Sequence, residues 1–181
     1  MTIELVLAIS LTIGISALCS TLEAMILSIT VAEIESLKEK KPKKGKLLEK
    51  FKIELEETSS AILSLNTIAN TLGATLVGGL AEKTFGSQGN TLLVFALGMT
   101  LGILFFSEIL PKNLAVSYRY EMAQKLIIPL ALVRWCMAPI SKICKVTVRA
   151  IVPPKDKQTE SDEQEIIPVS YTHLTLPTSY P

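Results

Sequence analysis

Apolar residues gather in three long runs along the chain, at residues 3–29, 59–81 and 91–110. Each run holds about the twenty residues that a helix needs to cross a hydrocarbon core of about 30 Å. The second run carries many hydroxyl and amide side chains but no formal charge, and Pro111 closes the third. The pattern predicts an all-α membrane protein with three transmembrane helices.

A fourth apolar stretch, residues 126–141, is shorter and contains Pro129, Pro139 and, at its centre, Arg134. Basic residues flank it on both sides: Lys125, Lys142, Lys145 and Arg149. Neither flank is therefore free of the positive charge that marks the cytoplasmic side of a span. A juxtamembrane belt helix in the membrane interface, with Trp135 at headgroup level, explains these features better than a fourth span, which is the alternative.

The lysines between the runs predict which parts of the chain face the cytoplasm. Eight lysines lie within residues 38–52, whereas the loop after the second run has only Lys83. The positive-inside rule therefore puts residues 30–58 in the cytoplasm and the N-terminus outside. Glutamates alternate with these lysines, which indicates a solvated helical hairpin that is broken at Pro42 and Gly45.

The composition fits a membrane protein with charged segments outside the bilayer. Of the 181 residues, 49% are hydrophobic and 19% are charged, and the mean hydropathy is +0.42. This hydropathy is too high for an ordinary soluble domain, and so much charge excludes a wholly buried bundle. A signal peptide is not expected, because Glu4 is the only early charge and the first run is too long. We expect a multi-pass plasma-membrane protein with a cytoplasmic C-terminus.

The character of the chain changes after the last apolar stretch. Residues 1–152 are predicted to form the transmembrane domain, and residues 153–168 an acidic linker into a cytosolic helical region. Residues 169–181 have no formal charge and no helical periodicity, and they resemble translated adapter read-through. We expect this stretch to be a non-native tail and the natural chain to be longer.

Glu23 lies inside the first run, where an ionised carboxylate costs several kcal/mol unless it has a partner. Polar residues share its helix face, and the other runs carry more at a similar depth, counted at about 1.5 Å per residue. Carboxylate, hydroxyl and amide oxygens suit a hard cation such as Mg²⁺, Ca²⁺ or Na⁺. The predicted cation-binding residues are Ser16, Ser20, Glu23, Asn66, Asn70 and Glu108.

A zinc site is not expected from the sequence. His173 is the only histidine, and the three cysteines, Cys19, Cys136 and Cys144, lack metal-ligand spacing. A metal site in the body of the chain would therefore use oxygen ligands.

Pro111 predicts an irregular backbone beside these residues. It has no N–H to donate to the carbonyl of Ser107, which leaves that carbonyl for another partner.

Two simpler interpretations of these polar residues are possible besides a cation site. Serine and asparagine in spans often only join helices, and Glu108 could be protonated or could pair with Lys112 one turn later.

Three short motifs resemble a known family. S-x-x-C-S-x-x-E-A begins at Ser16, N-x-x-x-N at Asn66 and S-E-I-L-P-K at Ser107. They resemble the signature segments of the transmembrane domain in CorC-type transporters and their cyclin M (CNNM) relatives, over about residues 1–150. Cys19 departs from the S-x-x-F-S pattern of that family.

The resemblance implies a homodimer of three-helix protomers with a belt helix, which exports Mg²⁺ as Na⁺ enters. It also implies that dehydrated Mg²⁺ binds oxygen atoms of Ser16, Ser20, Asn70 and Glu108. In that family a cytosolic helical bundle and a pair of CBS domains follow, and the CBS domains bind ATP with Mg²⁺. Those domains are missing from this sequence, so we expect no residue here to bind ATP.

Two stripes of small residues allow close helix packing: Gly98-x-x-x-Gly102 in the third run and Ala69-x-x-x-Gly73 in the second. Either stripe could form a dimer seam or pack inside one protomer. The family resemblance favours a homodimer without indicating which stripe forms it.

Two classes of function fit these observations. The first is Mg²⁺ efflux coupled to Na⁺ entry, and the alternative is a non-transporting membrane scaffold that regulates another ion channel. An enzyme is not expected, because the sequence has no histidine dyad, no paired aspartate site and no serine with a nearby base. The expected partners are membrane lipid and a second copy of the chain, and not nucleic acid.

Overall fold

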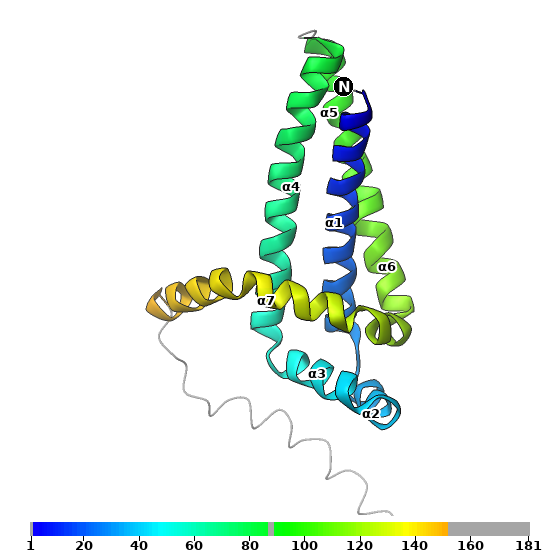
Figure 1. The fold of residues 1–181 in the computed structure, drawn as a ribbon, viewed down its shortest axis with the longest axis vertical. Coiled ribbons are helices and arrows are strands. Elements are labelled where there is room, and N and C mark those ends of the chain that lie inside the picture. Colours follow the sequence, from blue (N-terminus) through cyan, green and yellow to red (C-terminus); the bar gives the residue numbers. More distant parts are fainter. Residues whose placement is uncertain (1, 87–88, 152–181) are drawn as a thin grey trace, which may run out of the picture. The chain divides into compact units, whose positions relative to one another are not determined.

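The computed structural model describes residues 2–86 and 89–151, and these residues form helices joined by short connections (Figure 1). The all-α prediction is confirmed for this part of the chain. The chain divides into two units, residues 1–145 and 146–181, and the contacts below lie within the first. The predicted boundaries at residues 153 and 169 fall outside the described residues.

The elements follow one another with few residues between them. In chain order they are α1 (Thr2–Ser28), α2 (Val31–Lys40), α3 (Pro42–Ile53), α4 (Leu55–Phe85), α5 (Gly89–Gly102), the π-helix η1 (Ile103–Ile109), α6 (Leu110–Ser117) and α7 (Arg119–Ile151).

Four helical stretches of the described chain are long and apolar enough to cross a membrane. They are Thr2–Ser28, Leu55–Phe85, Gly89–Ser117 and Arg119–Ser141. The first three contain the three apolar runs of the sequence, and α4 extends the second run by about a turn at each end. The fourth contains the expected belt helix. Length and composition alone therefore allow a fourth span. The packing of α7 is the observation that bears on whether this helix spans the membrane or lies in its interface.

The predicted hairpin is present as α2 and α3. Thr30 begins α2 with a capping box, in which its hydroxyl accepts the Glu33 N–H and the Glu33 carboxylate accepts the Thr30 N–H. Pro42 starts α3, where its missing N–H costs no helical hydrogen bond. The predicted break at Gly45 was wrong, because Gly45 lies inside α3. A Cβ there would come within 2.5 Å of the Lys38 Cα, so glycine allows α2 and α3 to touch.

Two charged contacts hold the hairpin against the neighbouring helices. Lys52 donates to the carbonyls of Ile26 and Leu27 at 2.9 and 3.0 Å, where its charge complements the C-terminus of α1. Arg119 donates to both carboxylate oxygens of Glu33, at 2.9 and 3.0 Å. Burial alone would raise the pKa of Glu33, but hydrogen bonds from Thr30 and Arg119 outweigh it and lower the pKa below its ordinary value.

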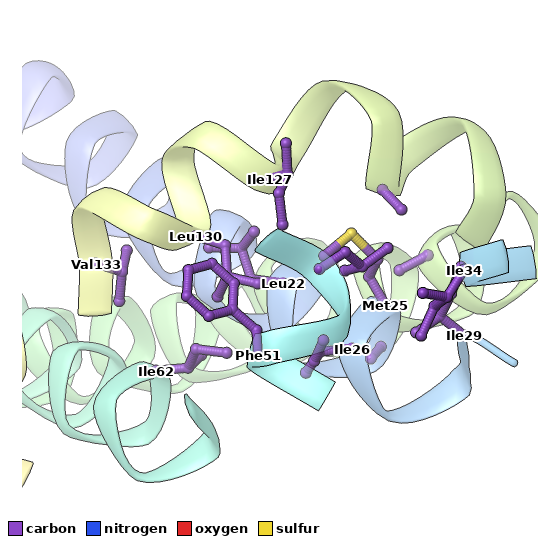
Figure 2. Packing of buried hydrophobic residues seen from close by; sticks show 14 of the residues in the cluster. Leu22, Met25, Ile26, Ile29, Ile34, Phe51, Ile62, Ile127, Leu130 and Val133 are labelled. Atoms are coloured by element: carbon purple, nitrogen blue, oxygen red, sulfur yellow. The ribbon is translucent and has the colours of Figure 1, made fainter. Parts of the chain in front are cut away.

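The main hydrophobic core lies where the C-terminal half of α1 meets α2, α3, the start of α4 and α7. Figure 2 shows the buried side chains that converge there from these helices. They include Leu22, Met25, Ile26, Phe51, Ile62, Ile127, Leu130 and Val133. A smaller cluster of Leu5, Val77 and Ala81 joins α1 to α4 near their other ends. Two separate apolar contacts therefore fix these two helices side by side.

The first half of α7 runs along the hairpin. The Tyr120 hydroxyl lies 3.5 Å from that of Ser36 in α2. One turn later, the Gln124 side chain accepts a hydrogen bond from Lys41 at 2.8 Å, and its backbone carbonyl accepts one from Lys44 at 2.6 Å. These contacts keep residues 120–124 beside segments that the lysine pattern puts in the cytoplasm.

Arg134 then ties α7 to the start of α4. Its guanidinium donates to the Glu54 carboxylate at 2.7 Å and the Thr58 hydroxyl at 3.3 Å, and it lies 4.8 Å from the centre of the Phe51 ring. Glu57 is 3.6 Å away. Arg134 is thus neutralised by protein carboxylates. In Figure 1, the part of α7 that belongs to the first unit crosses α1 and α4 instead of running alongside them.

Candidate cation site

A chain of buried polar groups links α1, α4 and η1. The Ser16 hydroxyl donates to the Asn66 side-chain oxygen at 2.8 Å and accepts a hydrogen bond from the Ser107 hydroxyl at 2.7 Å. Ser16 and Ser107 are both fully buried. The structure therefore brings Ser16 and Asn66 together, from helices fifty residues apart in sequence.

Two oxygen atoms near this chain have no hydrogen-bond partner among the described residues. They are the Ser20 hydroxyl oxygen, one turn along α1 from Ser16, and the Asn70 side-chain oxygen, one turn along α4 from Asn66. The Asn70 amide only approaches the Asn66 oxygen, at 3.5 Å. A buried polar atom without a partner costs about 1–3 kcal/mol, so such atoms call for a ligand or water. Hydroxyl and amide oxygens of this kind fit a hard cation.

Glu23 is paired with Lys112. The Lys112 ammonium lies 3.0 Å from the Glu23 carboxylate, which answers how α1 carries an acidic side chain among apolar residues. Lys112 could have paired with Glu108, one turn earlier in its own helix, but it reaches across to α1. Glu108 is half-buried and makes no hydrogen bond or ion pair with any other described residue. It follows Ser107 directly in the chain.

The backbone beside Glu108 is irregular. Residues 103–109 form the π-helix η1, and the N–H of Leu110 bonds to the Phe105 carbonyl, five residues back. Pro111 comes next, buried in the first turn of α6. Wide turns of this kind are rare and are frequently found at functional sites. At membrane depth, irregular backbone is tolerated where it lines a cavity or contacts protein.

A close contact between α1 and α4 lies beside the polar chain. A Cβ on Gly73 would come within 2.3 Å of the Thr12 side chain, so the Gly73 end of the stripe at Ala69 and Gly73 packs inside the protomer. The second stripe differs, because a Cβ on Gly98 or Gly102 would meet no atom within 4 Å. Nothing in the described chain packs against this face of α5.

The structure thus places the six predicted residues in three groups. Ser16 and Asn66 belong to the polar chain, Ser20, Asn70 and Glu108 lie within one helical turn of its members in sequence, and Glu23 is held by Lys112. The sequence prediction missed the Ser107 hydroxyl, because it considered only the carbonyl of this residue. Its place in the S-E-I-L-P-K motif, directly before Glu108, was the signal that could have found it.

The described residues contain no cluster of acidic, histidine or thiol side chains that could hold a metal ion. No group of three or more histidine, cysteine, aspartate or glutamate side chains comes together in residues 2–86 and 89–151. A cation at this position would depend on neutral oxygens and a single carboxylate.

These features coincide with a match to a known family. Residues 7–173 match the family described as the cyclin M transmembrane N-terminal domain. The chain belongs to this family. The match covers the three helices of the polar chain, the hairpin and α7, so this cyclin M domain is a multi-pass membrane domain.

Curated relatives of this cyclin M domain are longer proteins. A UPF0053 protein of Synechocystis sp. is 28% identical over 138 residues, which cover 76% of this chain and 39% of the relative. A DUF21 domain-containing protein of Arabidopsis thaliana, described as chloroplastic, is 28% identical over 138 residues and is covered for 20% of its length. The chain therefore spans between one fifth and two fifths of these relatives.

We predict that Asn66→Ala destabilises the domain in the absence of Mg²⁺. The change leaves the buried Ser16 hydroxyl without its acceptor, which costs about 1–3 kcal/mol of unfolding free energy. Thr67→Ala is the matched control, because Thr67 is exposed and its hydroxyl bonds only to its own helix at Leu63. Thermal unfolding in detergent measures the difference, and equal losses in the two variants would contradict the role of Asn66.

Proposed function

We propose that this domain carries Mg²⁺ across the membrane and that the ion binds between α1, α4 and η1. The observation that carries the proposal is a pair of buried oxygens, at Ser20 and Asn70, that have no partner within the described part of the chain and lie beside the chain of Ser16, Asn66 and Ser107. Oxygen ligands are those that Mg²⁺ prefers in proteins. Membership of the cyclin M family supports a transporter-like role for such a site.

The proposed ligands comprise one charged group and several neutral oxygen donors. Glu108 supplies the negative charge, and Ser16, Ser20 and Asn70 supply neutral oxygens that replace water around the ion. Asn66 orients Ser16 through their hydrogen bond. A site with a single carboxylate holds a divalent ion loosely, and conduction requires that a bound ion can leave again.

We further propose that the transport is Mg²⁺ efflux coupled to Na⁺ entry. Neutral hydroxyl and amide oxygens also accept Na⁺, so the same groups can bind either ion in turn. Efflux follows from the resemblance to CorC-type transporters. The process moves ions without covalent chemistry, and we assign no enzymatic activity to the chain.

The packing of α7 supports a topology of three spans, a cytoplasmic hairpin and a belt helix. Residues 120–124 bond to the lysine-rich hairpin, and Arg134 bonds to the start of α4, so this stretch stays at one end of α1 and α4. On its other side, α7 exposes Ile128, Leu132 and Trp135, with Trp135 76% exposed. An apolar face of this kind suits the lipid interface of the plasma membrane, with the N-terminus outside.

A scaffold that regulates another channel is the second candidate. The bonds of Ser16 to Asn66 and Ser107, and the pair of Glu23 with Lys112, join helices without any ion. Such contacts alone would suffice for a structural role. Mg²⁺ binding distinguishes the two functions.

We predict that Glu108→Gln and Asn70→Ala abolish the stabilisation of the purified domain by Mg²⁺. Binding to the folded state raises its stability by RT ln(1 + [Mg²⁺]/Kd), about 2.7 kcal/mol at a hundredfold excess over Kd. Glu39→Gln, on the exposed face of α2, is the control and should keep the full effect. The readout is the thermal unfolding midpoint against Mg²⁺ concentration, and identical shifts in all three variants would exclude the site.

Topology is tested by cysteine labelling in intact cells, after the native cysteines are replaced by alanine. We expect Lys83→Cys to react with an impermeant maleimide from outside, because it lies at the end of α4 away from the hairpin. Lys43→Cys and Lys157→Cys should react only after permeabilisation. Labelling of residue 157 in intact cells would mean that the chain crosses the membrane a fourth time.

We also propose that the domain is a homodimer whose seam includes Gly98 and Gly102. No residue of α5 is buried, and both glycines have open space where a side chain would lie. Backbones can approach closely across such a stripe. The stripe at Gly73 is already used inside the protomer.

Gly98→Leu combined with Gly102→Leu should convert the detergent-solubilised dimer to a monomer, measured by light scattering. Gly14→Leu on α1 changes a glycine with equally open surroundings and should leave the dimer intact. A wild-type chain that stays monomeric at all concentrations would refute the dimer, and a dimeric double variant would move the seam elsewhere.

A further inference from the structure

The ion pair of Glu23 and Lys112 joins α1 to α6 beside the polar contacts between α1 and η1. Both η1 and α6 contact α1, and the hydroxyls of Ser16 and Ser107 lie 2.7 Å apart. Seven residues further along α1 and five further along the other segment, the Glu23 carboxylate meets the Lys112 ammonium at 3.0 Å. Ser20 and Glu108 lie between these two contacts in sequence. The pair is therefore at the hairpin end of the proposed cation site.

The pair is accessible to water and can open. The Glu23 side chain is 27% exposed and that of Lys112 is 47% exposed. Ion pairs with this much exposure contribute at most about 1 kcal/mol, so stability alone does not explain a charged pair here. Lysine carries its charge on a flexible four-carbon stem, which lets the ammonium leave and return without moving the helix.

We propose that Lys112 is a tethered counter-cation, which neutralises Glu23 when no Mg²⁺ is bound and lowers the affinity of the site for Mg²⁺ by charge repulsion. The inference rests on the proposed function, since it concerns the same site. Lys112 is an affinity-setting residue and not a ligand, because an ammonium has no lone pair to offer a metal. Its charge keeps the ion from being held too tightly to be released.

The direction in which removing Lys112 changes the Mg²⁺ affinity distinguishes an electrostatic role of this residue from a structural one. Removing Lys112 leaves Glu23 unneutralised three residues along α1 from Ser20 and seven from Ser16, roughly 5–10 Å at 1.5 Å per residue. At that distance, with protein-like dielectric and salt screening, one unit of charge changes the affinity for a divalent ion on the order of tenfold. A merely structural pair predicts weaker Mg²⁺ binding whichever partner is removed.

The test measures the Mg²⁺ dissociation constant of the full chain in detergent, from thermal unfolding midpoints against Mg²⁺ alone. We expect Lys112→Met to bind Mg²⁺ about tenfold more tightly and Glu23→Gln to bind it about tenfold more weakly. The double variant should return close to wild type. Lys112→Arg keeps the charge and should also match wild type. Lys43→Met makes the same chemical change at an exposed residue of α3 and should leave the constant unchanged.

Several outcomes would overturn the inference. If the wild type binds Mg²⁺ and Lys112→Met binds it equally or more weakly, Lys112 does not act as a counter-cation. The proposed function is unaffected by that result. Absence of Mg²⁺ binding in wild type and Lys112→Met alike refutes both. Should Lys112→Met fail to fold, the double variant must still bind Mg²⁺ more tightly than Glu23→Gln, and equal binding by these two overturns the inference.

Discussion

Polar groups inside apolar helices have to find partners on neighbouring helices, and the arrangement of this cyclin M domain depends on that requirement. Water is scarce at membrane depth, so each hydroxyl, amide or carboxylate on α1 needs a group on another helix or a ligand. Ser16 finds Asn66 on α4 and Ser107 on η1, and Glu23 finds Lys112 on α6. These contacts restrict the rotation of α1 against both neighbours. Beside these contacts, the Ser20 and Asn70 oxygens find no hydrogen-bond partner among residues 2–86 and 89–151.

The main hydrophobic core holds the end of α1 that is nearest the hairpin. Leu22, Met25 and Ile26 of α1 are buried against α3, α4 and α7, so this end is held by packing from several helices. By contrast, α5 buries none of its residues in the described chain. A firm end and an exposed face suit a protomer that is completed by lipid and, in our proposal, by a second copy.

The π-helix has a local cause and a wider consequence. Pro111 cannot join the regular ladder, and η1 widens the helix directly before it. The widened segment contains Ser107 and Glu108, and the Ser107 hydroxyl reaches Ser16. An irregular backbone is thus held in place by a side-chain bond to α1.

Much of this organisation follows from the sequence alone, because it depends on geometry within one helix. Apolar run length gave the long helices, and Pro42 marked the turn of the hairpin. The spacing of Ser16, Ser20 and Glu23 put them on one face whatever surrounds them. The motifs around Ser16, Asn66 and Ser107 indicated the cyclin M family, which the match over residues 7–173 shows.

Choices between partners on different helices needed the tertiary structure. Lys112 could reach Glu108 one turn earlier in the chain or Glu23 on α1, and in the folded structure it pairs with Glu23. The sequence offers Arg134 no partner within its own stretch, but Glu54 lies 2.7 Å away because α7 packs on the start of α4. Gly73 packs on Thr12 while Gly98 stays open, although both glycines lie in similar stripes. Helix rotation and offset are set by all packed side chains together, and a periodic pattern along one helix does not contain them.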